Sequence, residues 1–217
     1  MSKLNKLQKF EALKTLPNVF EFPEDIKGTW HSDVFKNNKP IVLELACGKG
    51  DYTLAMSKLY PNKNFIGIDI KGARIWKGAV SAHEQKLNNA YFLRIYIEQL
   101  TDYFEKEEIS EIWITFPDPF IKKSKRRKRL TSERFLKMYN ELLPKNGRVH
   151  LKTDSNLLYD FTLESIESNN ANIVMNSDDI YAGLAKKNEL LNIQTYYERM
   201  HLKEGRKIHY VQFQFNN

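Results

Sequence analysis

Asp118 lies between two prolines, and a strongly basic octet, residues 122–129, begins four positions after it. Seven of the eight octet residues are lysine or arginine. The whole chain has 34 Lys and Arg against 27 Asp and Glu, so the octet accounts for the entire formal net charge of +7. Lysine and arginine neutralise phosphates without reading base sequence, so the pattern indicates a polyanion held beside an acid. We therefore expect an enzyme that acts on a nucleic acid.

A second group of candidate residues consists of Gly48 and Gly50 with two acids, Glu44 and Asp69. Two glycines let the backbone approach a ligand closely, and an acid about twenty residues further on is placed to bind ribose hydroxyls. The third glycine of a dinucleotide fingerprint is missing, because position 53 is Thr53, and the P-loop spacing is absent as well. The remaining template resembles the S-adenosylmethionine site of Rossmann-like methyltransferases. A turn that serves only close packing of strand and helix is the alternative.

Two further polar clusters belong to the same candidate site. Asp154 ends the segment Lys152-Thr-Asp154, and it either caps the helix that follows or contacts a ligand. Thr195-Tyr-Tyr-Glu198 stands shortly before the last strand and is placed to fold back over a pocket.

Metal and nucleophilic chemistry are not favoured. The five histidines show no paired metal-ligand spacing, and Cys47 is the single cysteine, so we expect no metal site. The sequence also lacks the Gly-x-Ser-x-Gly elbow of serine hydrolases.

The elements that must position these residues alternate between strand and helix, with an acid or a glycine turn after several of the strands. Apolar runs predict strands over 41–45, 65–70, 91–95, 109–116 and 148–153, and helices over 52–59, 73–86, 132–143 and 157–167. Thr131 is expected to cap the third of these helices. Strict alternation near the end predicts an antiparallel edge strand over 208–215. The fold expected is α/β: a Rossmann-like, doubly wound, mainly parallel sheet of about seven strands.

Composition sets the remaining limits. With 217 residues, 41% of them apolar, the chain can bury one core of ordinary size. Residues 1–39 are expected to be a basic, helical N-terminal extension, and residues 40–217 the main domain. A single cysteine, no signal peptide and no membrane-spanning run favour the cytoplasm and predict no membrane partner. Nothing in the sequence favours a monomer over a homodimer.

Five segments in order resemble the bacterial tRNA (guanine-N7)-methyltransferases. They are Glu44-Leu-Ala-Cys-Gly-Lys-Gly50, Ile66-Gly-Ile-Asp69, Phe116-Pro-Asp-Pro119 with the basic octet, His150-Leu-Lys-Thr-Asp154 and Thr195-Tyr-Tyr-Glu198. The resemblance covers roughly residues 40–215. It departs from the family's pattern at Ala46, where glycine is usual, at Asp69, where glutamate is commoner, and at Tyr96, where an acid is usual.

The resemblance implies methyl transfer from S-adenosylmethionine, with no metal, to N7 of guanine 46 in the variable loop of tRNA. It implies that Asp118 is the catalytic acid. The cofactor-binding residues that follow are Glu44, Gly48, Gly50, Asp69, Tyr96 and Asp118. The residues implied for the target guanosine are Lys122, Asp154, Thr195, Tyr196, Tyr197 and Glu198. The residues implied for the rest of the RNA are Lys122, Lys123, Ser124, Lys125, Arg126, Arg127, Lys128 and Arg129.

Two alternatives stay open. One is a methyltransferase that acts on another RNA site or on protein. The other is a non-catalytic RNA-binding protein on a methyltransferase scaffold, for which Ala46 and Tyr96 are the hints. Binding of S-adenosylmethionine separates the second alternative from both enzymes.

Overall fold

The computed structural model describes residues 4–216, and the chain divides into two compact units, residues 1–105 and 106–217. Each unit is an α/β arrangement with four strands among its described residues.

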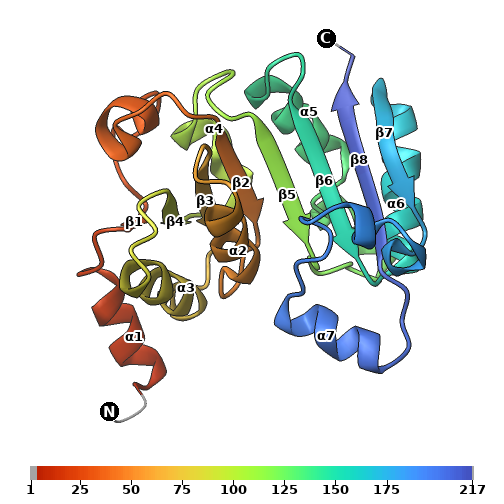
Figure 1. Cartoon of the computed structure of the whole chain (residues 1–217). Helices are drawn as coiled ribbons and strands as arrows, with labels where there is room; N and C mark the ends of the chain where they lie inside the picture. The colour runs from red at the N-terminus through yellow and green to blue at the C-terminus, as the bar shows by residue number, and fades with distance from the viewer. Residues whose placement is uncertain (1–3, 217) are drawn as a thin grey trace. The chain divides into compact units, whose positions relative to one another are not determined.

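The first unit has four parallel strands in the order β1-β4-β3-β2 (Figure 1). Helices connect them, as parallel pairing requires. Its strands are β1 (Val19–Glu21), β2 (Ile41–Leu45), β3 (Asn64–Ile68) and β4 (Ala90–Arg94). Its helices are α1 (Lys6–Leu13), α2 (Asp51–Leu59), α3 (Gly72–Glu84) and α4 (Leu100–Tyr103), with short turns η1 (Trp30–Phe35) and η2 (Ile97–Gln99).

The ring of Phe92 on β4 is a centre of the first core. A Cβ added at Gly50 would lie 2.5 Å from this ring, and one added at Gly78 would lie 2.8 Å from it. At Gly67 the same distance would be 3.0 Å. These three glycines, one at the start of α2, one on β3 and one on α3, therefore make room for one aromatic side chain. This close packing fixes the turn after β2 against the helices that follow it.

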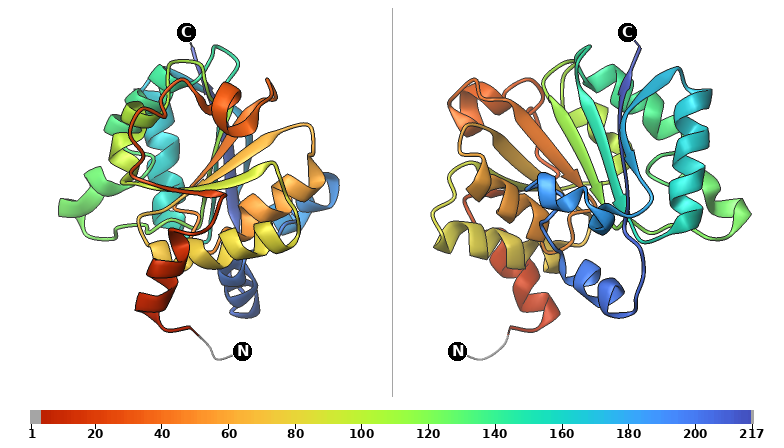
Figure 2. Two further views of the ribbon diagram at one scale, coloured as in Figure 1. Left: turned by 90° about the vertical axis from the view of Figure 1, so that its left-hand side faces the viewer. Right: turned by 45° about the vertical axis from the view of Figure 1, so that its right-hand side comes forward.

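The predicted N-terminal extension packs into the first unit. Its described part begins with α1, which lies beside α3 (Figure 2), and the side chain of Leu13 is fully buried there. β1 then pairs with β4, and Trp30 stacks on Phe104 with ring centroids 5.2 Å apart. Residues 4–39 thus contribute a strand and core aromatics to the unit.

The second unit has the strand order β5-β6-β8-β7, with β8 antiparallel to both neighbours. Its strands are β5 (Glu111–Thr115), β6 (Arg148–Thr153), β7 (Ala171–Ser177) and β8 (His209–Phe215). Its helices are α5 (Glu133–Leu142), α6 (Asn156–Ser168) and α7 (Tyr196–Lys203), with short turns η3 (Lys123–Lys128), η4 (Ile180–Ala182) and η5 (Ala185–Lys187).

The mainly parallel α/β fold is confirmed, and so is the antiparallel direction of the C-terminal strand. That strand has one more strand outside it, β7, which forms the edge. β7 was not predicted, because its side chains are mostly exposed and carry no strong apolar pattern. Within residues 4–216, no helix is long and apolar enough to cross a membrane.

The predicted cap of α5 is wrong. The helix begins after Ser132, whose hydroxyl makes no capping bond. Thr131 is fully buried instead, and its hydroxyl shares a hydrogen bond of 2.7 Å with that of Thr162 on α6. A buried hydroxyl needs a partner, and this pairing joins the start of α5 to α6.

Candidate active site

The turn after β2 has the left-handed backbone that glycines permit. Gly48 has a φ angle of 58° and Gly50 one of 70°. A Cβ on Gly48 would meet no atom within 4 Å, whereas Gly50 lies against Phe92. Gly48 therefore presents bare backbone to open space, and Gly50 serves packing. Ala46 also has a positive φ of 56°, which explains in physical terms why glycine is usual there.

The two acids of this turn hold its backbone. Asp69 lies just after β3, and its carboxylate accepts hydrogen bonds from the amides of Gly48 at 3.0 Å and Lys71 at 2.9 Å. Glu44 is only 2% exposed and accepts hydrogen bonds from the amide of Thr53, at 2.7 Å, and from its hydroxyl. The acids thus tie the turn to β3 and to α2.

The turn is also a region of negative potential. Burial raises the pKa of the Cys47 thiol well above its usual value, and the nearby charges of Glu44 and Asp69 raise it further. Burial disfavours a charge of either sign, but the two carboxylates, which also raise this pKa, favour a cation. The turn therefore suits a ligand that carries positive charge, as a sulfonium does.

Tyr96 lies two residues after the end of β4, immediately before η2. Its side chain is 55% exposed, and its ring centroid is 6.0 Å from that of Phe22. The exposed ring is available for stacking.

In the second unit, Asp118 is exposed at the carboxyl end of β5. Its Oδ1 accepts a hydrogen bond of 2.9 Å from the amide of Phe120. Phe116 and Phe120 have φ angles of 48° and 43°, which is rare for bulky residues and costs on the order of 1–3 kcal/mol each. Strained backbone on both sides of an exposed acid is typical of a functional site.

Arg129 holds this strained loop in place. Its Nε donates to the carbonyl of Pro119 at 3.0 Å, and one terminal nitrogen donates to the carbonyl of Phe120 at 3.1 Å. The guanidinium lies 4.5 Å from the centroid of the Phe161 ring on α6. Burial is the main cause that lowers the pKa of Arg129. The side chain is only 6% exposed, so it is part of the scaffold of the Asp118 loop.

The rest of the octet forms an exposed helical turn, η3. All residues from Lys122 to Lys128 have exposed side chains. The carbonyl of Arg127 accepts hydrogen bonds from the Ser132 hydroxyl at 3.0 Å and from Nε of Arg134 at 2.7 Å. The basic segment thus has a defined conformation held against the start of α5.

Asp154, at the carboxyl end of β6, is held by two basic side chains from the segment before β8. Its Oδ2 accepts a hydrogen bond of 2.8 Å from Arg206 and lies 3.6 Å from Nε2 of His201. The cap of α6 is Ser155, whose hydroxyl accepts from the amide of Leu158. Of the two alternatives for Asp154, helix capping is therefore wrong.

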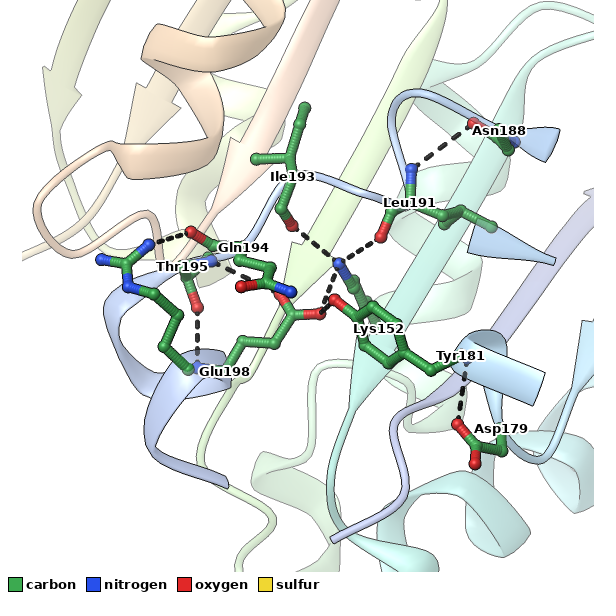
Figure 3. A network of polar contacts seen from close by, with 10 residues as sticks. Lys152, Asp179, Tyr181, Asn188, Leu191, Ile193, Gln194, Thr195 and Glu198 are labelled. Atoms are coloured by element: carbon green, nitrogen blue, oxygen red, sulfur yellow. Dashed lines mark hydrogen bonds and ion pairs between the residues drawn. The ribbon is translucent and has the colours of Figure 1, made fainter. Parts of the chain in front are cut away.

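A buried ion pair between Lys152 on β6 and Glu198 on α7 was not predicted (Figure 3). Lys152 and Glu198 are both 0% exposed, and Nζ lies 2.8 Å from Oε1. Nζ also donates to the carbonyls of Leu191 at 2.9 Å and Ile193 at 2.8 Å. Burial lowers the pKa of Lys152, and Glu198 opposes this shift. The ammonium thereby fastens the segment before α7 to β6.

Glu198 has further partners in the same network. Tyr181 donates its hydroxyl proton to Oε1 at 2.7 Å, and burial, with this bond, raises the pKa of the phenol. Thr195 and Glu198 form a capping box at the start of α7: the Thr195 hydroxyl accepts from the Glu198 amide at 3.1 Å. Tyr196 and Tyr197 lie between them and are about half exposed.

The second unit thus brings several predicted residues together. The amide of Phe116 donates to the carbonyl of Lys152 at 2.9 Å, and the rings of Phe116 and His201 are 6.1 Å apart. His201 in turn lies beside Asp154. The Asp118 loop, the end of β6 and α7 therefore adjoin one another. The predicted cofactor residues other than Asp118 all belong to the first unit.

The missed residues share one property: their partners are distant in sequence. Lys152 belongs to the Lys-Thr-Asp segment, but nothing in the sequence predicts its burial, and no sequence pattern marks Arg206 or Tyr181. Within residues 4–216, no three His, Cys, Asp or Glu side chains are grouped as metal ligands would be.

Comparison with known proteins identifies relatives of the whole chain. Residues 38–211 match a family described as "Putative methyltransferase". The chain is 46% identical to a tRNA (guanine-N(7)-)-methyltransferase of Porphyromonas gingivalis over 93% of this chain and 86% of that protein. It is 42% identical to a protein of the same name from Christiangramia forsetii, over 98% of this chain and 99% of that protein.

Among solved structures, the chain is similar to the 16S rRNA methyltransferase KamB. The TM-score is 0.67, with 89% of this chain and 96% of that chain covered. The sequences are only 11% identical, so this likeness concerns the fold. It agrees with the Rossmann-like class that the strand pattern predicted.

Proposed function

Since the chain belongs to the family of the tRNA (guanine-N(7)-)-methyltransferases, we propose that it methylates N7 of guanine 46 in the variable loop of tRNA. The observation that carries the proposal is the pair of acids Asp118 and Asp154, which follow the neighbouring parallel strands β5 and β6. Parallel strands end at the same edge of a sheet, where α/β enzymes bind their ligands.

The methyl donor fits the turn after β2 in the first unit. Gly48 offers open backbone, Asp69 and Glu44 provide negative charge, and Tyr96 offers an exposed ring. S-adenosylmethionine, when bound, supplies an electrophilic methyl group on a sulfonium. We assign the binding of its positively charged groups to the two acids of the turn. Gly48 allows the cofactor to approach the backbone closely. Because the carboxylates of both acids accept bonds from backbone or Thr53, they also keep the turn in shape.

The reaction needs little acid–base chemistry. Guanine N7 carries an in-plane lone pair and no proton at neutral pH, so no base has to activate it. Catalysis then depends on holding N7 in line with the methyl group, and good alignment alone lowers the barrier by about 7–11 kcal/mol in well-oriented reactions.

Asp118 and Asp154 have the right chemistry for this task. A carboxylate accepts hydrogen bonds from N1–H and the exocyclic amine of guanine, which are on the edge opposite N7. Asp118 is exposed, and its Oδ1 accepts a hydrogen bond from the amide of Phe120. The half-exposed rings of Tyr196 and Tyr197 suit stacking on a base drawn out of the tRNA core.

Glu198 has a different role in this scheme. Its carboxylate is 0% exposed and is engaged by Lys152 and Tyr181. It therefore stabilises the first turn of α7, which carries Thr195 and the two tyrosines. Lys122 and the exposed octet side chains are left to meet phosphates of the RNA.

The test is a methylation assay on unmodified tRNA with a labelled donor, followed by borohydride cleavage to map 7-methylguanine. We expect a single modified position in the variable loop. Asp118→Asn removes the charge and replaces one of the two acceptor oxygens by an amino donor, so it should lower kcat/KM roughly 10- to 100-fold. A wild-type protein that leaves N7 of tRNA unmethylated, or an Asp118→Asn variant of full activity, would refute the assignment.

A further inference from the structure

A groove outside the Asp118 loop lies between η3, the start of α5 and the outer side of α6. Its volume is 580 Å³. Its basic side chains come from the octet and from α5: Arg126, Arg127, Arg134 and Lys137. Polar groups near the end of α6, Ser168 and Asn169, lie on the other side.

The groove has an excess of positive charge. Four cations line it against two acids, Glu133 and Glu164. Glu133 is paired with Lys137 at 2.8 Å, and this contact, mainly its hydrogen bond, lowers the pKa of Glu133. The four cations and two acids leave a formal excess of two positive charges, and an anion is the ligand that this charge attracts.

The walls of the groove are ordered before any ligand arrives. Arg126 lies 5.2 Å from the centroid of the Phe161 ring, on the wall formed by α6. Nε of Arg134 donates to the Arg127 carbonyl, so the backbone of the octet is bound to α5 at Arg127. The terminal nitrogens of an arginine held in this way are directed by its scaffold, and paired arginines bind phosphate oxygens well.

We propose that this groove binds the sugar-phosphate backbone of the tRNA at a second place, away from the nucleotide that is methylated. The inference rests on the proposed function and extends it. The octet is then one wall of a larger surface whose other cations, Arg134 and Lys137, belong to α5. Arg129 is excluded from this surface, because its side chain is buried under the loop.

A matched pair of double variants tests the proposal. Arg134→Ala with Lys137→Ala removes one arginine and one lysine from the groove. Arg148→Ala with Lys145→Ala removes the same two residue types beside the opposite end of β6, where both side chains are exposed. Lys137 lies five residues before the end of α5, about 7.5 Å along the helix axis, and the control positions lie beyond that end.

The readout is binding of labelled tRNA as a function of salt. Two lost phosphate contacts should make the log–log salt slope shallower by about 1.4–1.8, and should raise Kd at least about tenfold at 0.1 M salt. The control variant should keep the wild-type slope. In turnover, KM for tRNA should rise in the groove variant while kcat at saturating tRNA stays within about twofold.

A third variant guards against disturbance of the octet, because Arg134 also holds Arg127. Ser168→Glu adds a negative charge at an exposed position of the groove and leaves the loop contacts intact. We expect weaker tRNA binding from it as well. Equal salt slopes for the groove variant, its control and the wild type would overturn the proposal. A wild type that binds tRNA without methylating N7 would refute the proposed function alone.

Discussion

Replacement of Lys152 by methionine tests the buried ion pair of the second unit. Methionine has nearly the length of lysine but neither its charge nor its donors. The Lys152→Met variant therefore loses the contact of 2.8 Å to Glu198 and the bonds to two carbonyls. It leaves a carboxylate that is 0% exposed without its ammonium partner, with the hydroxyl of Tyr181 and the amide of Thr195 as remaining donors.

The expected loss of stability is large. Breaking a buried pair from one side costs about 3–5 kcal/mol, because the remaining charge stays desolvated. The total free energy of unfolding of a domain is about 5–15 kcal/mol. For a chain of this size each kcal/mol shifts Tm by about 2–4 °C, so a decrease of about 6–20 °C is expected.

A double-mutant cycle isolates the pair. Glu198→Gln keeps the shape of the side chain, and a lone Lys152, whose pKa burial already lowers, can release its proton. That variant should be less destabilised than Lys152→Met. The combination of both changes should cost clearly less than the sum of the two, with a coupling free energy of at least about 1 kcal/mol. Lys145→Met, at an exposed lysine, serves as the control and should stay within about 0.5 kcal/mol of wild type.

The assay is urea unfolding, with amide hydrogen exchange as the local readout. The carbonyls of Leu191 and Ile193 lose their donor, so exchange should accelerate across residues 190–198 before it does in β6. Full additivity in the cycle, together with unchanged exchange in this segment, would show that the pair does not hold α7.

Three further predictions follow from other contacts. Gly48→Ala should cost only about 1–2 kcal/mol of stability, because of its positive φ, but should weaken cofactor binding in calorimetry. Gly50→Ala adds an overpacking cost of about 1–3 kcal/mol, because its Cβ would meet the ring of Phe92. Equal stability of the two variants would contradict this packing. Arg129→Lys keeps the charge but loses the guanidinium that holds the Asp118 loop through two hydrogen bonds, so kcat should fall roughly 10- to 100-fold with little change in KM for tRNA. Lys128→Ala should mainly raise KM for tRNA. A raised KM with unchanged kcat in Arg129→Lys would place Arg129 on the RNA. Burial lowers the pKa of His209, so below about pH 6.5 the unfolded chain binds a proton more readily than the folded chain does. The free energy of unfolding therefore decreases as the pH is lowered, by at most about 1.4 kcal/mol per pH unit. In urea midpoints, His209→Gln should show a shallower decrease between about pH 7 and pH 5.

The parallel strands were predictable because each is an apolar run bounded by polar turns. β2 and β3 are buried along their whole length, and their sequences read as strands without any tertiary information. β1 and β7 escaped prediction for the opposite reason. β1 has only three residues, and β7 alternates weakly because it lies at an edge with much of it exposed.

The candidate site divides in the same way. Positions just after strands, such as Asp69, Asp118 and Asp154, follow from the rule that ligands bind at the carboxyl ends of parallel strands. The burial of Lys152 and Arg129 does not follow from any local rule, since their charges suggest exposure. Their partners, Glu198 for one and the carbonyls of Pro119 and Phe120 for the other, come from turns and segments that only the folded chain brings near.

The conformation of the octet bears on the thermodynamics of RNA binding. η3 is already wound, and hydrogen bonds to the Arg127 carbonyl fasten it to α5. A basic arm that is disordered when free has to order on its ligand, and the association then shows a large negative heat-capacity change and loses affinity to entropy. Here the arm is shaped beforehand. Complex formation should accordingly resemble the docking of rigid surfaces, governed by release of counterions and nearly insensitive to temperature.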